Sequence, residues 1–219
     1  MNKIRVSGTG ISPSRAPRAW AIREELLLNG YALVPRALDS GLAEQLRRDI
    51  KLHAVAKSSA SRDRTLLDGY PRLESIRLVV ENEQIRDLAL AVCGEDARLH
   101  AAKGAVRAAG EGELSLHTDT AAVTSSPFVR SAQFFTVHII CEPFEPEHGA
   151  TFFVPYSHRL LRNPTSTEAD SADRVCLSAE PGDLLCWLGE TWHGRYSRTT
   201  PGERVSLFLM FTAADIDSD

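Results

Sequence analysis

The segment Leu114–Asp119 carries a histidine and an aspartate two residues apart, His117 and Asp119. Side chains at positions i and i+2 of a β-strand point to the same face, so Ser115, His117 and Asp119 are predicted to share one face. Two residues span about 7 Å of strand, and an imidazole and a carboxylate at that separation can converge on one ion. This pair is predicted to supply two ligands of a metal site.

A facial triad needs one more histidine, and His193 is the candidate. It lies in the segment Gly189–Gly194, after a predicted strand Asp183–Leu188 that follows the turn signal Pro181-Gly182. Two imidazoles and one carboxylate on Fe(II) leave three adjacent coordination positions. Those positions can take a bidentate 2-oxo acid and then O2.

A basic residue begins the last predicted strand. Alternation places Arg204, Ser206 and Phe208 on one face of this strand. A buried arginine is costly unless it meets an anion. A guanidinium matches a carboxylate in a two-point fork, and a hydroxyl two residues on can add a hydrogen bond. Arg204 and Ser206 therefore fit the distal carboxylate of 2-oxoglutarate.

Each of these residues also has an ordinary structural explanation when it is taken alone. An isolated H-x-D pair occurs by chance, a lone histidine such as His193 is more often structural, and a lone arginine such as Arg204 is usually at the surface. The specificity comes from their order and from the eleven residues that separate His193 from Arg204.

The elements before residue 94 are predicted to be mainly helical. Apolar residues recur at the helical period up to a stop at Asn29-Gly30, and Asp39 or Ser40 could cap a second helix. A third helix is predicted from about Glu83 to Cys93, and Lys57–Gly69 is predicted to be a loop.

After Gly94 the pattern changes to short runs with period-two alternation, broken by Gly and Pro. These runs predict a mainly β fold with flanking helices, a double-sheet jelly roll, with the loop Arg162–Asp173 as its mobile segment. One domain is expected over residues 19–219, with a helical flank to about 94 and a jelly-roll core over 95–212, after a flexible arm at 1–18. The predicted strands are Tyr31–Val34, Arg98–Ala108, Leu114–Thr118, Ser131–Cys141, Thr151–Val154, Val175–Ser178, Asp183–Leu188 and Val205–Thr212.

Composition and charge limit the class of protein. The 219 residues are 43% hydrophobic and 25% charged with a net charge of −4, which is ordinary for a globular domain. The sequence shows no basic patch, which disfavours a nucleic-acid partner. Its apolar runs are far shorter than the roughly 20 residues of a membrane span. Four cysteines without a C-x-x-C pair predict free thiols and a cytoplasmic protein.

From about Leu26 onward the chain resembles the phytanoyl-CoA dioxygenase-like family of Fe(II)/2-oxoglutarate oxygenases. The resemblance implies a double-stranded β-helix of the cupin-like jelly-roll type, Fe(II) at His117, Asp119 and His193, and 2-oxoglutarate at Arg204 and Ser206. In His148–Arg159, His148 and Tyr156 replace the family's usual Asn and Gly, which concerns loop shape more than chemistry. The segments that carry the resemblance are Asn29–Pro35, Leu116–Asp119, His148–Arg159, Pro181–Gly194, Arg204 and Ser206.

Further residues near these motifs receive roles by the same resemblance. Arg107 lies where family members often carry a basic residue, and it is expected to contact the co-substrate or a substrate anion. Gln133 is expected to be another cavity residue. Trp187 and Trp192 are interpreted as core residues, one of which could also form a wall of the substrate cavity. The remaining histidines of the second half are interpreted as structural: His138, His148 and His158.

The activity that the resemblance implies is hydroxylation of an unactivated C–H bond in a small molecule, with release of succinate and CO2. Related halogenases lack the carboxylate ligand, so Asp119 favours hydroxylation. Natural-product intermediates, amino acids and acyl thioesters remain open as substrates, although acyl-CoA is disfavoured because no basic patch awaits its phosphates. The alternatives are a non-catalytic member acting as a partner or regulatory subunit, and a cupin-like iron enzyme that does not use 2-oxoglutarate.

Overall fold

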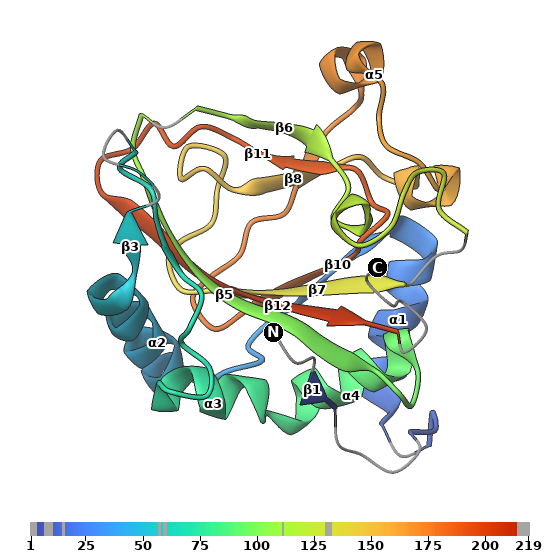
Figure 1. Ribbon diagram of the computed structural model, residues 1–219, viewed down its shortest axis with the longest axis horizontal. Coiled ribbons are helices and arrows are strands. Elements are labelled where there is room, and N and C mark those ends of the chain that lie inside the picture. The colour runs from blue at the N-terminus through green and yellow to red at the C-terminus, as the bar shows by residue number, and fades with distance from the viewer. Residues whose placement is uncertain are drawn as a thin grey trace.

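Two β-sheets lie face to face in the computed structural model, and helices pack on the outside of the larger sheet (Figure 1). The structure describes residues 4–6, 11–14, 16–56, 58, 61–110, 112–129 and 133–213. In spatial order the larger sheet contains β2 (Tyr31–Val34), β10 (Leu184–Leu188), β7 (Phe134–Ile140), β12 (Glu203–Thr212), β5 (Arg98–Ala108), β4 (Arg64–Leu66) and β3 (Val55–Ala56), and β1 (Ile4–Arg5) also pairs with β5. The smaller sheet contains β6 (Leu114–His117), β11 (His193–Arg195), β8 (Thr151–Phe153) and β9 (Val175–Cys176). The predicted jelly roll is confirmed.

The helix boundaries follow from local chemistry. Helix α1 (Pro17–Asn29) ends where Gly30 takes a φ of 93°, a left-handed conformation that suits glycine. Helix α2 (Ser40–His53) begins after Asp39, whose carboxylate accepts the Leu42 N–H at 3.0 Å. The stop at Gly30 and the cap at Asp39 were both predicted. The predicted third helix is α4 (Glu83–Cys93).

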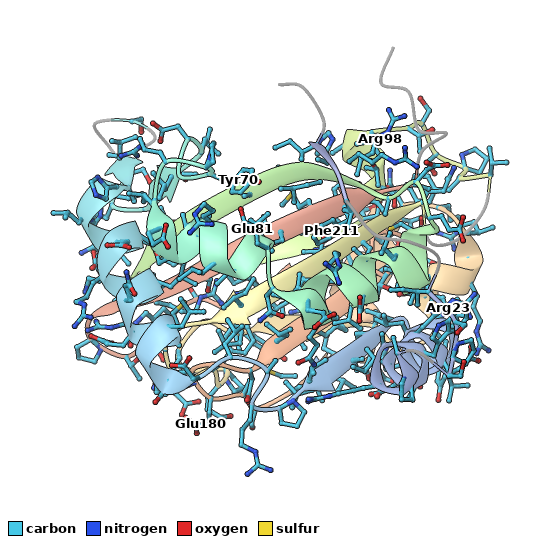
Figure 2. The ribbon with its side chains drawn as sticks, turned by 90° about the horizontal axis from the view of Figure 1, so that it is seen from below. Arg23, Tyr70, Glu81, Arg98, Glu180 and Phe211 are labelled. Atoms are coloured by element: carbon cyan, nitrogen blue, oxygen red, sulfur yellow. The ribbon has the colours of Figure 1, made fainter. Side chains whose placement is uncertain are left out.

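The helices cover the outer face of the larger sheet, as the view from below shows (Figure 2). Apolar side chains on the helices, such as Leu46 and Leu88, pack in one buried cluster with Val137 and Leu209 of the sheet. Burial of such side chains contributes roughly 1.5–3 kcal/mol each. Because this face is closed by the helices, the opposite face of the sheet is the one available to a site.

The inner face of the larger sheet is set by its strand register. In an antiparallel sheet, residues directly opposite each other project to the same side. Arg204 of β12 lies opposite Arg107 of β5. Phe208 of β12 lies opposite His138 of β7. The inner face therefore changes from basic at one end of β12 to aromatic in its middle.

Several short elements were not predicted. Helix α3 (Glu74–Val80) and strand β11 are absent from the prediction, and β4 lies inside the predicted loop Lys57–Gly69. The predicted mobile loop Arg162–Asp173 contains helix α5 (Ser166–Ser171), which begins with a capping box. Strands of three residues and helices of six or seven are too short to show a hydrophobic period, which is why the sequence pattern missed them.

The ends of the predicted segments include residues that the structure does not describe. Of the predicted arm, residues 1–3, 7–10 and 15 lie outside the described part, while Ile4–Arg5 forms β1 and α1 begins at Pro17. The strand predicted from Ser131 is described from Phe134, and residues 130–132 lie outside the described part. The division into an arm and one domain stays a prediction.

Two other expectations concern cysteines and membranes. All four cysteines, Cys93, Cys141, Cys176 and Cys186, are free thiols as predicted. Burial raises the pKa of the Cys176 thiol to about 11, so it stays protonated near neutral pH. Over the residues that are described, every helix is too short or too polar to cross a bilayer.

Candidate metal and co-substrate site

Three potential metal ligands meet between the two sheets. His117 is the last residue of β6, and His193 is the first residue of β11 and lies directly opposite His117 in the smaller sheet. Asp119 follows two residues after His117. One ligand atom from each of the three side chains lies within 4.8 Å of the others. The structure thus brings together the triad predicted from the sequence.

Asp119 reaches the site by a turn and not by strand alternation. Strand β6 ends at His117, and Asp119 has helical backbone angles (φ −72°, ψ −33°) at the start of a 3-10 turn, Thr120–Ala122. The prediction that Ser115, His117 and Asp119 share one strand face is therefore wrong at Asp119. The turn brings Asp119 Oδ1 to 3.8 Å from His117 Nε2 and 3.6 Å from His193 Nε2, which is closer than neighbours along one strand face.

Backbone carbonyls orient both histidines. His117 Nδ1 lies 3.0 Å from the Ser115 carbonyl oxygen, and His193 Nδ1 lies 2.9 Å from that of Thr191. A neutral imidazole that donates from Nδ1 keeps the lone pair of Nε2 for a cation. Both Nε2 atoms point toward Asp119, so the chemistry of this donor set fits a divalent metal with two nitrogens and one oxygen.

The second oxygen of Asp119 is held by two residues of the larger sheet. Thr136 Oγ1 and Trp187 Nε1 each donate to Oδ2 at 2.9 Å. These donors fix the carboxylate so that Oδ1 faces the histidines. Trp187 was predicted only as a core or wall residue, and nothing in the sequence pattern singled out Thr136.

The pKa shifts of the three triad residues show that a positive charge at the point where they meet would be stabilised. Burial acts to raise the pKa of Asp119, but the histidines and the Trp187 hydrogen bond outweigh it and hold that pKa well below its usual range. Burial acts to lower the pKa of His193, but Asp119 raises it overall. The pKa of His117 is lowered by burial and by His193. A bound divalent cation would supply this positive charge.

Arg204 is a buried cation at the other end of the inner face. It is 1% exposed, its guanidinium lies 5.2 Å from the centre of the Phe144 ring, and its Nη1 donates to the Gly149 carbonyl oxygen. Burial, followed by the charges of Arg195 and Arg107, lowers the pKa of Arg204 to about 9. Within the described part of the chain no carboxylate lies at ion-pair distance from it, so the site favours an anionic guest.

Four of the buried polar atoms that have no hydrogen-bond partner in the described structure belong to the inner face of β12 and β7. They are Arg204 Nε, Ser206 Oγ and both ring nitrogens of His138. Buried polar groups are rarely left unpaired, and each needs an explanation. A carboxylate accepts from exactly such donors in number and kind: a guanidinium, a hydroxyl and an imidazole N–H. These residues fit the distal carboxylate of 2-oxoglutarate.

His138 differs from the structural histidine that the sequence suggested. Its ring stacks on Phe208 with centroids 4.2 Å apart and meets the Phe144 and Trp187 rings edge-on. Burial lowers the pKa of His138 well below its ordinary value, which makes the ring neutral with one N–H to donate. His158, in contrast, has Nε2 3.1 Å from the Leu27 carbonyl oxygen and fits the structural interpretation.

A cavity of about 120 Å³ connects the triad with Arg204. Trp187 and Phe208 line it, whereas Trp192 packs with Leu116 and Phe152 in a separate cluster. The lining residues are Lys103, Arg107, Leu114, His117, Asp119, Thr151, Trp187, His193, Gly194, Arg195, Arg204, Phe208 and Met210.

Of the two further residues assigned by resemblance, Arg107 lines the cavity and Gln133 does not. Arg107 lines the cavity, and its Nη1 pairs with Asp63 at 3.0 Å. Gln133 is not among the lining residues, although its side-chain oxygen is buried without a hydrogen-bond partner in the described structure. Ser206 is 1% exposed and is likewise outside the lining. The roles of Gln133 and Ser206 in binding stay predictions.

A family model matches most of the chain. The family model for phytanoyl-CoA dioxygenase (PhyH) matches residues 26–206. A comparison with curated protein sequences gave no match.

Solved structures share the fold at low sequence identity. EctD from S. alaskensis with bound Fe has a TM-score of 0.78 at 16% identity, covering 97% of this chain and 82% of EctD. HygX from Streptomyces hygroscopicus, with nickel, 2-oxoglutarate and hygromycin B bound, has a TM-score of 0.75 at 16% identity over 90% of this chain and 88% of HygX. The epimerase SnoN from nogalamycin biosynthesis has a TM-score of 0.73 at 24% identity over 93% and 82%.

The hydrogen bond from Trp187 to Asp119 gives a testable consequence for metal affinity. We expect Trp187→Phe to weaken Fe(II) binding about tenfold or more, because partners that orient a ligand typically contribute about 10–100-fold. Anaerobic calorimetric titration with Fe(II) measures it. Trp192→Phe is the control, because Trp192 is also buried but donates its Nε1–H to the Arg162 carbonyl oxygen. Equal affinities for the two variants would contradict the role given to Trp187.

Proposed function

The chain belongs to the phytanoyl-CoA dioxygenase (PhyH) family of Fe(II)/2-oxoglutarate-dependent oxygenases, and we propose that it hydroxylates an unactivated C–H bond of a small molecule. The observation that carries the proposal is one cavity with a His-Asp-His triad at one side and a buried arginine at the other. Within the described residues the arginine has no carboxylate at ion-pair distance, and its Nε has no hydrogen-bond partner.

His117, Asp119 and His193 would hold the metal, and Arg204 with Ser206 would hold the distal carboxylate of the co-substrate. Together with O2, Fe(II) and 2-oxoglutarate supply the oxidising power: one oxygen atom enters succinate as CO2 leaves, and the other converts R–H into R–OH. The chain itself keeps Asp119 ionised and oriented and excludes water from Arg204. It also presents apolar walls, formed by Trp187 and Phe208, to the part of the substrate that reacts.

His138 is proposed as a further donor to the co-substrate carboxylate. It lies on the same inner face as Arg204 and Ser206, is neutral, and has no partner for either nitrogen in the described structure. Leaving a buried donor unpaired costs about 1–3 kcal/mol. A carboxylate that accepts from His138 would recover this cost only when 2-oxoglutarate is bound.

The carboxylate ligand supports hydroxylation among the possible reactions. Asp119 occupies the position that a halide needs in a halogenase of this type, so chloride transfer is disfavoured. Structural neighbours include the epimerase SnoN and the carbocyclase SnoK, both described as alpha ketoglutarate dependent. Natural-product and amino-acid-like metabolites are the proposed substrate range, and a cytoplasmic location without nucleic-acid or membrane partners remains the expectation.

We expect a visible charge-transfer band that appears only when both Fe(II) and 2-oxoglutarate have been added. We expect the band on anaerobic titration of the protein with Fe(II) and 2-oxoglutarate, and we expect Arg204→Met to raise the Kd of 2-oxoglutarate at least tenfold. A hydrogen bond to a charged group contributes roughly 1.5–3 kcal/mol, and about 1.4 kcal/mol is a factor of ten. Absorption spectra recorded at increasing 2-oxoglutarate give the affinity.

The control for this titration is Arg198→Met. Arg198 is also a buried arginine, but it donates to the His148 and Pro201 carbonyl oxygens and lies outside the cavity lining. Iron that binds without a band on adding 2-oxoglutarate would favour a non-catalytic partner subunit or an enzyme that does not use this co-substrate. A band that is unchanged in Arg204→Met would remove Arg204 from the co-substrate site.

The role of His138 predicts opposite effects on binding and on stability. We expect His138→Phe to raise the Kd of 2-oxoglutarate about tenfold, because the donor is lost. The same change should keep or raise the melting temperature of the ligand-free protein, because an unsatisfied buried group is replaced by an aromatic ring among aromatic rings. The charge-transfer titration and thermal unfolding measure the two quantities.

His158→Phe is the matched control for His138. His158 is buried and has Nε2 3.1 Å from the Leu27 carbonyl oxygen, so we expect this variant to lose stability without a change in co-substrate affinity. An unchanged Kd together with lower stability in His138→Phe would show a structural histidine and would overturn its assignment.

A further inference from the structure

Cationic side chains from three different strands surround the cavity. The lining contains four of them and a single carboxylate, Asp119. The four are Lys103 and Arg107 of β5, Arg195 of β11, and Arg204 of β12. In the sequence these residues are far apart, which is why no basic patch was visible there and why acyl-CoA was disfavoured as a substrate.

The strand register places these cations on both walls of the cavity. Arg107 lies opposite Arg204, and Lys103 lies opposite Phe208, so Lys103 and Arg107 share the inner face of the larger sheet. Arg195 lies in the smaller sheet, opposite Leu114 and Thr151. A molecule between the sheets therefore meets positive charge from both sides, from Lys103 on one wall and Arg195 on the other.

Binding of the metal and co-substrate does not remove this excess of positive charge. Fe(II) carries two positive charges and 2-oxoglutarate two negative ones, so the pair leaves the charge of the lining unchanged. Asp63, which pairs with Arg107, offsets one of the cations. Before these ligands bind, burial and the charges of Arg195, Arg107 and Arg198 lower the pKa of Arg204, and Asp63 raises it. A cavity lined by one sign of charge attracts the opposite sign.

The rest of the lining indicates the size and polarity of the guest. Leu114, Trp187, Phe208 and Met210 give the cavity an apolar side. The cavity volume of about 120 Å³, part of which the co-substrate would fill, lies below the roughly 300–1,000 Å³ of typical ligand pockets. Leu114 is 47% exposed and marks the side that opens to solvent. Such a site suits a small molecule with one charged end.

We propose that the substrate is a small amphipathic molecule bearing a compact oxyanion, a carboxylate or a phosphate monoester, that Lys103 and Arg195 bind while its apolar part faces the metal. Arg195 can form a two-point fork with such a group, and Lys103 acts as a point charge. This inference rests on the proposed function, because it names the substrate class of the same site.

The test uses probes that differ only in their polar end. Butanoate, butyl phosphate, butanamide and butan-1-ol are titrated anaerobically into protein saturated with Fe(II) and 2-oxoglutarate, and the shift of the charge-transfer band gives each Kd. We expect at least one of the two anions to bind about tenfold or more tightly than either neutral probe. The anion that binds more tightly distinguishes a carboxylic acid from a phosphate ester.

Substitutions of Lys103 and Arg195 test whether these two side chains bind the anions. Lys103→Gln and Arg195→Gln are each expected to weaken anion binding about tenfold while the charge-transfer band with Fe(II) and 2-oxoglutarate still forms. Arg48→Gln is the control, because it removes the same charge from a side chain that is 66% exposed and outside the cavity. We expect Arg48→Gln to bind the anions as the unaltered protein does.

Three outcomes would overturn the inference while the proposed function stands. In the first, the band forms with Fe(II) and 2-oxoglutarate, but the anions bind no more tightly than the neutral probes. In the second, the anions abolish the band, which shows that they displace the co-substrate. In the third, Lys103→Gln and Arg195→Gln bind the anions normally. A band that never forms would instead refute the proposed function, and this inference with it.

Discussion

The structure depends on one constraint, that three ligands must face one point between two sheets that share no hydrogen-bonded strands. The pairing of β6 with β11 places His117 opposite His193. The turn after β6 directs the Asp119 side chain toward both histidines. Thr136 and Trp187 then hold Asp119 from the larger sheet. This carboxylate therefore connects the two sheets, and the register of four strands is coupled to the geometry of the triad.

A second set of groups follows from the same arrangement. With helices packed on its outer face, the larger sheet has its inner face available for a ligand site. It carries there the Arg204 Nε–H, the Ser206 hydroxyl and the His138 imidazole, for which the described residues supply no hydrogen-bond partner. Such groups reduce the stability of the ligand-free protein. A bound dianionic co-substrate would supply the missing hydrogen bonds. Binding at Arg204 and His138 is therefore expected to raise the stability of the protein.

The sequence predicted most elements and the residues of the triad, because long periodic segments and caps such as Asp39 act locally. It did not predict how Asp119 reaches the site, because strand alternation and a turn give the same H-x-D spacing. It also missed Thr136, His138 and the cationic walls. Their roles arise from cross-strand register, which brings together residues distant in the chain and leaves no local signal. The resemblance to a family supplied Arg107, which does line the cavity, and Gln133, which does not.

We propose that this chain couples O2 to oxidative decarboxylation of 2-oxoglutarate at its own iron site. The most direct measurement is turnover of the purified Fe(II) protein with 2-oxoglutarate under oxygen-18 gas, with mass analysis of the succinate formed and with Asp119→Ala in parallel. We expect succinate that carries one labelled oxygen atom from O2, and almost no succinate from the variant. Unlabelled succinate, no succinate from iron-loaded protein supplied with an accepted substrate, or full turnover by Asp119→Ala would contradict it.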